Sequence, residues 1–104
     1  ATVVSTPTKN RAIIDAGSKV LTSDLFGMND HGAVVNFPEL RITQLSEEHG
    51  TIMSEQNTNL EIGQKIQIIP NHACVVTNML DEVNLITEEK KLKKVKVVAR
   101  GKVW

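Results

Sequence analysis

The apolar residues of this chain come in short bursts rich in β-branched side chains, and Gly, Pro, Asn or Asp residues separate the bursts. Val, Ile and Thr fit a pleated, half-buried backbone, whereas an amphipathic helix needs a longer pattern with a period near 3.6 residues. Bursts this short, with this punctuation, are typical of many short strands. The sequence therefore predicts an all-β fold.

The two ends of the chain each have the form of a β-hairpin. At the N-terminus, residues 2–4 and 12–14 flank the polar segment 6–10, whose Pro and Asn suit a tight reversal. At the C-terminus, the predicted strands within 82–98 flank the charged segment 88–91 in the same way. Both pairs are expected to be antiparallel.

The middle of the chain holds four further predicted strands and one short helix. The strands are expected at 33–37, 40–45, 50–53 and 60–70. The last of these alternates apolar and polar side chains for nearly its whole length, which makes it the clearest predicted strand. Gly63 suggests a bend before the strand proper, and Pro70 ends the strand because it has no N–H to donate. Residues 15–32 lack periodicity and are expected to form a long irregular segment, while the apolar spacing over 73–80 favours a short helix. With about eight short strands and no crossover helices, the predicted architecture is an antiparallel barrel or sandwich.

Charge and size exclude several classes of function. Lys plus Arg and Asp plus Glu are equal at 12 each, so the chain lacks the positive field that nucleic-acid binding uses. The lysines of 90–96 have no interleaved aromatic residue for stacking on bases. No apolar run approaches the ~20 residues that span a bilayer, and the N-terminal ten residues lack the form of a signal peptide. We therefore expect neither nucleic acid nor a membrane as a partner.

The chain length and the cysteine count suggest one domain in a reducing compartment. A chain of 104 residues is the size of a single ordinary domain. Its single cysteine cannot form an internal disulfide, and so the expected location is cytoplasmic.

His72 and Cys74 are the residues with the clearest potential for chemistry, since they lie two positions apart just after Pro70. In extended backbone, side chains at i and i+2 share a face, so both can reach one metal ion. Two ligands are too few for a closed structural zinc site but suit an open one. A cysteine that acts as a small hydrophobic residue, beside a hydrogen-bonded histidine, is the commoner explanation of such a pair, and the spacing alone is a weak signal for a metal site.

Two further segments bring charged residues together beside a glycine. Residues 46–50 read Ser-Glu-Glu-His-Gly, where Glu48 and His49 suit acid–base work or metal ligation. Residues 15–19 read Asp-Ala-Gly-Ser-Lys, where small residues beside Asp15 and Lys19 allow close approach to a ligand. An ordinary turn also explains residues 15–19, and for residues 46–50 the residues alone favour a solvated turn.

Taken in this order and spacing, the three segments resemble the C-terminal portion of the D-threonine aldolase and D-serine dehydratase family, the pyridoxal-phosphate enzymes related to alanine racemase. The resemblance also includes Asn78 and Ala99-Arg100-Gly101, so it spans nearly the whole chain. It implies that residues 1–104 form a single β-domain, the C-terminal part of a two-domain enzyme. The cofactor lysine of that family belongs to an N-terminal barrel domain absent from this sequence, so no residue here is assigned to pyridoxal phosphate.

The resemblance also implies site residues and an activity. His72 and Cys74 match the family's divalent-metal pair, and a soft thiolate in the second position favours zinc over manganese. The implied reaction is that of a metal-assisted lyase acting on D-β-hydroxy amino acids, either D-serine dehydratase-like or D-threonine aldolase-like. Four further residues are expected to line the active-site cleft or the subunit boundary: Asp15, Lys19, Glu48 and His49.

The implied partners are the N-terminal barrel domain of the same enzyme, a D-amino acid substrate and a second subunit in a homodimer. The isolated 104-residue domain is expected to be inactive. A function of a different class stays open, namely a self-sufficient small β-barrel that binds a ligand or a protein without catalysis. Zinc titration of variants at His72 and Cys74 separates the two hypotheses.

Overall fold

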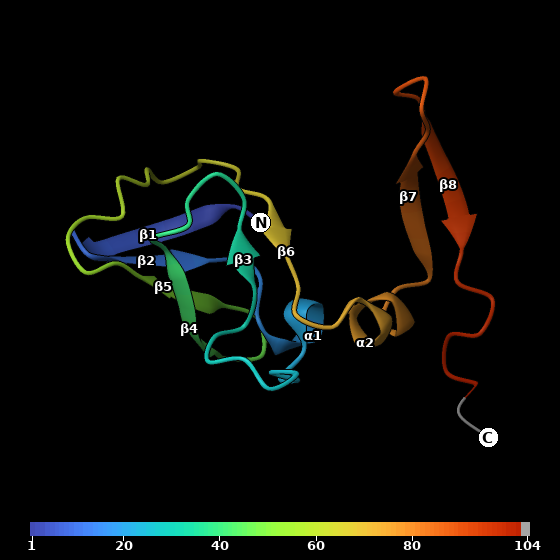
Figure 1. Cartoon of the computed structure of the whole chain (residues 1–104), viewed down its shortest axis with the longest axis horizontal. Coiled ribbons are helices and arrows are strands. Elements are labelled where there is room, and N and C mark those ends of the chain that lie inside the picture. The colour runs from blue at the N-terminus through green and yellow to red at the C-terminus, as the bar shows by residue number, and fades with distance from the viewer. Residues whose placement is uncertain (103–104) are drawn as a thin grey trace.

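The computed structural model describes residues 1–102, and these form eight strands and two short helices (Figure 1). The strands are β1 (Val3–Thr8), β2 (Arg11–Ile14), β3 (Ala33–Val34), β4 (Arg41–Leu45), β5 (Gly50–Met53), β6 (Ile68–Ile69), β7 (Glu82–Ile86) and β8 (Leu92–Lys96). The helices are α1 (Ser18–Leu21) and α2 (Ala73–Asn78). The predicted all-β class, the number of strands and the short helix near 73–80 are confirmed.

Six of the strands form one antiparallel sheet in the order β1-β2-β5-β4-β3-β6, which curls into a half-barrel (Figure 1). The segment before β6 reaches across to the start of β1, where Thr2 and Lys65 form an isolated bridge. The amide of Ile66 donates to the carbonyl of Ala1 over 2.9 Å, and the amide of Val3 donates to the carbonyl of Gln64 over 2.9 Å. These bonds join the two edges of the curled sheet.

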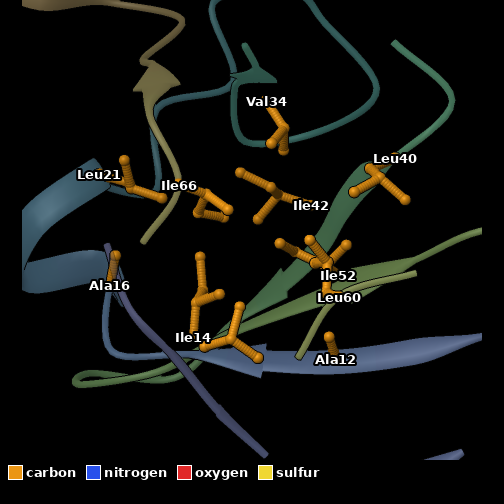
Figure 2. Packing of buried hydrophobic residues seen from close by; sticks show 11 residues of the cluster. Ala12, Ile14, Ala16, Leu21, Val34, Leu40, Ile42, Ile52, Leu60 and Ile66 are labelled. Carbon is orange, nitrogen blue, oxygen red and sulfur yellow. The ribbon is translucent and has the colours of Figure 1, made fainter. Parts of the chain in front are cut away.

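The hydrophobic core lies inside this curl (Figure 2). Neighbouring strands place matching residues opposite one another, so that Ala12 faces Ile52 and Ile52 faces Ile42. All three are fully buried. Further buried residues come from the loops and from α1: Ala16, Leu21, Leu40, Leu60 and Ile66. Side chains from the long connections therefore contribute to the core together with those from the strands.

In the segment 60–70, the bend predicted at Gly63 is confirmed, but the strand predicted after it is much shorter than expected. Only Ile68 and Ile69 form a strand, because the chain turns at Gly63, whose φ is +87°. The turn is closed by a bond from the amide of Gln64 to the carbonyl of Glu61. The alternation has another origin: Leu60 and Ile66 are buried on either side of the turn, whereas Ile62 is 68% exposed at its tip.

Two other boundaries differ from expectation. Strand β1 continues to Thr8, so the reversal predicted at 6–10 is confined to Lys9 and Asn10. Pro7 is tolerated within β1 because that strand lies at one end of the sheet order, where a missing N–H costs least. The segment 15–32 is irregular as predicted except for α1, a single turn too short to produce a periodic signal.

The C-terminal hairpin of β7 and β8 stands apart from the curled sheet, beyond α2 (Figure 1). Its strands pair antiparallel as predicted, with Val83 opposite Val95 and Ile86 opposite Leu92. Ile86 and Leu92 are 70% and 72% exposed. In the part of the chain that the structure describes, no packed sheet covers these apolar side chains of the hairpin. A two-stranded hairpin alone is only marginally stable in water. Within the described range 1–102, no helix is both long and apolar enough to cross a bilayer.

Candidate metal centre

His72 is the residue that precedes α2, and its side chain packs against the loop 22–30. The Nδ1 atom of His72 lies 2.7 Å from Oδ2 of Asp24. The His72 and Phe26 rings lie with their centroids 4.8 Å apart and their planes inclined by 44°. The His72 side chain is 28% exposed, so it is held by its neighbours and still open to solvent.

Asp24 is ionised in this arrangement. Its hydrogen bond with His72, followed by the bond from the amide of Phe26, holds the pKa of the carboxyl below its ordinary value. An ionised carboxylate only accepts hydrogen bonds, so Nδ1 of His72 is the donor. In the neutral imidazole the remaining nitrogen, Nε2, then carries the free lone pair that a metal ion binds.

Cys74 lies in the first turn of α2 and is a free, exposed thiol. His72 has the expected extended backbone, with φ and ψ of −132° and 94°. Cys74 does not, so the prediction that extended backbone places both side chains on one face is wrong. The helix begins at Ala73, so the two side chains project from the junction between a loop and a helix. The alternative interpretation is wrong for Cys74, which is not buried, whereas its other half, a hydrogen-bonded histidine, is confirmed for His72.

Within residues 1–102, no cluster of three or more His, Cys, Asp or Glu side chains is placed to hold a metal ion. His72 and Cys74 alone suit a site that leaves the other coordination positions to water, substrate or a second polypeptide.

Lys19 and Glu48, predicted from separate segments, meet on the surface. Nζ of Lys19 lies 2.5 Å from Oε1 of Glu48 and 3.2 Å from Oε2 of Glu47. The backbone beneath them interlocks, because the amides of Ser18 and Lys19 donate to the carbonyls of Ser46 and Glu47 over 2.8 and 3.1 Å. The two charged segments of the sequence are therefore one structural unit.

The Lys19→Met variant is expected to raise the pKa of Glu48 towards its ordinary value near 4.5. In the native protein, hydrogen bonding and charge attraction from Lys19 hold this pKa lower. A depressed folded pKa means that the pair adds stability above the unfolded pKa and loses it as pH falls through the folded pKa. Carboxyl NMR titration measures the change. An unchanged Glu48 pKa in Lys19→Met, or an equal rise in a Lys93→Met control, contradicts the pairing.

Asp15 and His49, the other two predicted site residues, do not take part in the Lys19–Glu48 ion pair. Asp15 Oδ1 accepts the amide of Thr2 over 2.6 Å, and this bond lowers the pKa of its carboxyl, so Asp15 fastens the N-terminus to the end of β2. His49 lines an open hollow on the sheet together with His31 and Thr51. The structure brings Lys19 and Glu48 together, whereas Asp15 is held by the N-terminal backbone.

Two residues that contact His72 carry no signal in the sequence. Asp24 and Phe26 lie in the loop 22–30, and Asp24 is separated from His72 by 48 positions. No spacing pattern links residues so far apart, and an acidic residue in an irregular loop has many ordinary explanations. Only the fold shows that this loop lies against the start of α2.

The comparisons with known proteins agree with this fold. Residues 1–86 match the family described as "Putative serine dehydratase domain". An uncharacterized protein of Mycobacterium tuberculosis is 35% identical over 94 residues, which are 88% of this chain and 71% of that protein. The D-serine dehydratase of Dictyostelium discoideum is 35% identical over 106 residues, covering 88% of this chain and 27% of the enzyme.

Among solved structures, the D-threonine aldolase of Filomicrobium marinum superposes with a TM-score of 0.81 at 29% identity. The match covers 99% of this chain and 28% of the aldolase. The chain thus spans about a quarter of the length of the two enzymes that it matches. The matched residues 1–86 include the whole curled sheet, the loop 22–30 and α2, and on this evidence the chain belongs to the serine dehydratase domain family.

Proposed function

We propose that this chain is the C-terminal β-domain of a pyridoxal-phosphate-dependent lyase that acts on D-β-hydroxy amino acids, and that His72 and Cys74 hold its divalent metal. The substrate class follows from what the D-serine dehydratase and D-threonine aldolase relatives are named for. The observations that support the proposal are an imidazole oriented by Asp24 at His72 and an exposed thiol at Cys74, two positions further along at the start of α2.

The donor set fits a divalent metal. An imidazole nitrogen and a thiolate are ligands that zinc prefers, and the thiolate disfavours manganese. A bound zinc ion supplies Lewis acidity for a substrate hydroxyl, and pyridoxal phosphate on a barrel domain supplies the electron sink. The residues of this chain contribute the rest: His72 and Cys74 fix a metal position, while Asp24 and Phe26 hold the imidazole in place.

The surface of the domain supports its membership of a larger, two-domain enzyme. The β7–β8 hairpin carries strongly exposed Ile86 and Leu92, and such apolar surface is normally covered by another part of a protein. In the proposed enzyme this cover is the N-terminal barrel of the same chain or of a second subunit in a homodimer. The free thiol of Cys74 favours a reducing compartment, so we place the enzyme in the cytoplasm.

Titration with excess Co²⁺ tests the metal site, because a thiolate bound to cobalt gives a charge-transfer absorption band. Cys74 is the single cysteine, so it alone can produce such a band. We expect the band in the wild-type protein, its loss in Cys74→Ala and a weakened or lost band in His72→Ala. Zinc is expected to displace the cobalt, which confirms competition for the same donors.

A His49→Ala variant is the matched control, since it removes another exposed imidazole outside the pair and is expected to keep the band. Circular dichroism of each variant verifies that the fold is retained. A wild-type protein without the band, or variants that bind cobalt and zinc as the wild type does, would refute the metal site.

A second candidate function is a small β-barrel module that binds a ligand or protein without catalysis. The Mycobacterium tuberculosis relative favours it, because the aligned 94 residues are already 71% of that protein. Too little of that chain remains for a barrel domain, which needs roughly 200 residues or more. Indistinguishable zinc binding by wild type, His72→Ala and Cys74→Ala is the result that selects this module.

A further inference from the structure

The carboxylate of Asp24 is held at both of its oxygens. Oδ1 accepts the amide of Phe26 over 2.9 Å, while Oδ2 faces Nδ1 of His72 at 2.7 Å. The amide of Asp24 itself donates to Oγ1 of Thr22 over 3.3 Å. The loop thus orients the carboxylate, and the carboxylate in turn fixes the rotation of the imidazole.

The loop is also fastened to the backbone on which His72 sits. Nδ2 of Asn71 donates to the carbonyls of Leu25 and Asp30 over 3.1 and 2.5 Å, so the residue next to His72 binds both sides of the loop. Phe26 adopts a left-handed backbone with φ of +50°. This conformation is unfavourable for a bulky residue, and it places the aromatic ring against His72.

We propose that Asp24 is the positioning residue of the metal centre, which holds the Nδ1–H tautomer of His72 so that Nε2 alone faces the metal. The inference rests on the proposed function, because His72 must be a ligand for its orientation to matter. Carboxylates that accept a hydrogen bond from a ligating histidine fix the ring and raise its basicity, and their loss typically lowers metal affinity by about 10- to 100-fold.

Two measurements test this role in the full 104-residue chain. The first is the tautomer of His72 in the metal-free protein, read from long-range ¹H–¹⁵N correlations at a pH of about 8.5, well above the pKa of free histidine. We expect the Nδ1–H form in wild type and a shift towards Nε2–H in Asp24→Ala. The His72→Ala variant identifies the signals.

The second measurement is the zinc dissociation constant by competition with a chelator. Asp24→Ala is expected to weaken binding about 10- to 100-fold, whereas Asp24→Asn, which keeps an acceptor oxygen, recovers part of the loss. Asp81→Ala removes the same charge beside Arg100 and is expected to bind zinc as the wild type does. A general loss of negative charge would weaken Asp81→Ala as well.

The outcomes separate this inference from the metal site itself. If His72→Ala loses zinc but Asp24→Ala keeps both wild-type affinity and the wild-type tautomer, the positioning role is overturned and the metal site stands. An affinity loss in Asp24→Ala without any change of tautomer also overturns it, because Asp24 would then act as a ligand or a support of the loop. If the wild type binds no metal, the site and the positioning role fail together.

Discussion

Replacement of Gly17 by alanine is expected to lower the free energy of unfolding by about 3 kcal/mol or more, among the largest effects of a single methyl group in this chain. A Cβ at this position would lie 2.5 Å from the carbonyl oxygen of Ser46 and would also meet the carbonyl of Glu47. Both carbonyls accept hydrogen bonds from α1, so neither can retreat without losing a bond. Urea unfolding followed by circular dichroism measures the change.

Gly27→Ala is the matched control, because it adds the same methyl group without close neighbours. Its φ of +79° makes alanine strained, so we expect a cost of about 1–2 kcal/mol from backbone conformation alone. The difference between the two variants isolates the clash. Equal midpoints for Gly17→Ala and Gly27→Ala would show that the backbone around α1 gives way easily.

The close packing at Gly17 also explains why residues 15–19 and residues 46–50 lie side by side in the structure. A Cβ at Gly50 would lie 2.7 Å from the carbonyl oxygen of Ala16, so the two segments interlock at two glycines. Their glycines are explained by close packing of backbone, while Lys19 and Glu48 remain exposed on the surface. The part of the family resemblance that lies in Gly17 and Gly50 is therefore structural, and it carries no chemistry by itself.

The strands were predictable where apolar alternation and turn residues agree. Residues 40–45 and 50–53 became β4 and β5 nearly unchanged, since each is a β-branched burst between clear breaks. The segment 60–70 failed because alternation records burial, and Leu60 and Ile66 are buried without belonging to one continuous strand. The bend itself was predictable from Gly63, but the confinement of the strand after it to Ile68 and Ile69 was not.

The candidate site also has one part that the sequence could predict and one part that it could not. The spacing of His72 and Cys74 is local, so the sequence could indicate the pair, and the resemblance could suggest a metal. The partner of His72 is set by tertiary structure, because Asp24 reaches it only when the loop 22–30 folds against the start of α2. Side chains that orient a ligand are commonly distant in sequence, and no periodicity marks them.

Ile52→Ala is expected to cost about 2–5 kcal/mol, since the removed atoms leave a cavity that the packed core inside the curled sheet cannot fill. Ile52 is fully buried on β5 between Ala12 and Ile42, and its neighbours belong to strands fixed on both sides by the ladder. The urea midpoint should fall with little change in the slope, which would indicate lost stability in an unchanged fold. Ile86→Ala removes the same atoms from a side chain that is 70% exposed, so we expect a change within about 0.5 kcal/mol. Similar losses in the two variants would place the stabilising core in the hairpin as well as in the curled sheet, contrary to the burial seen here.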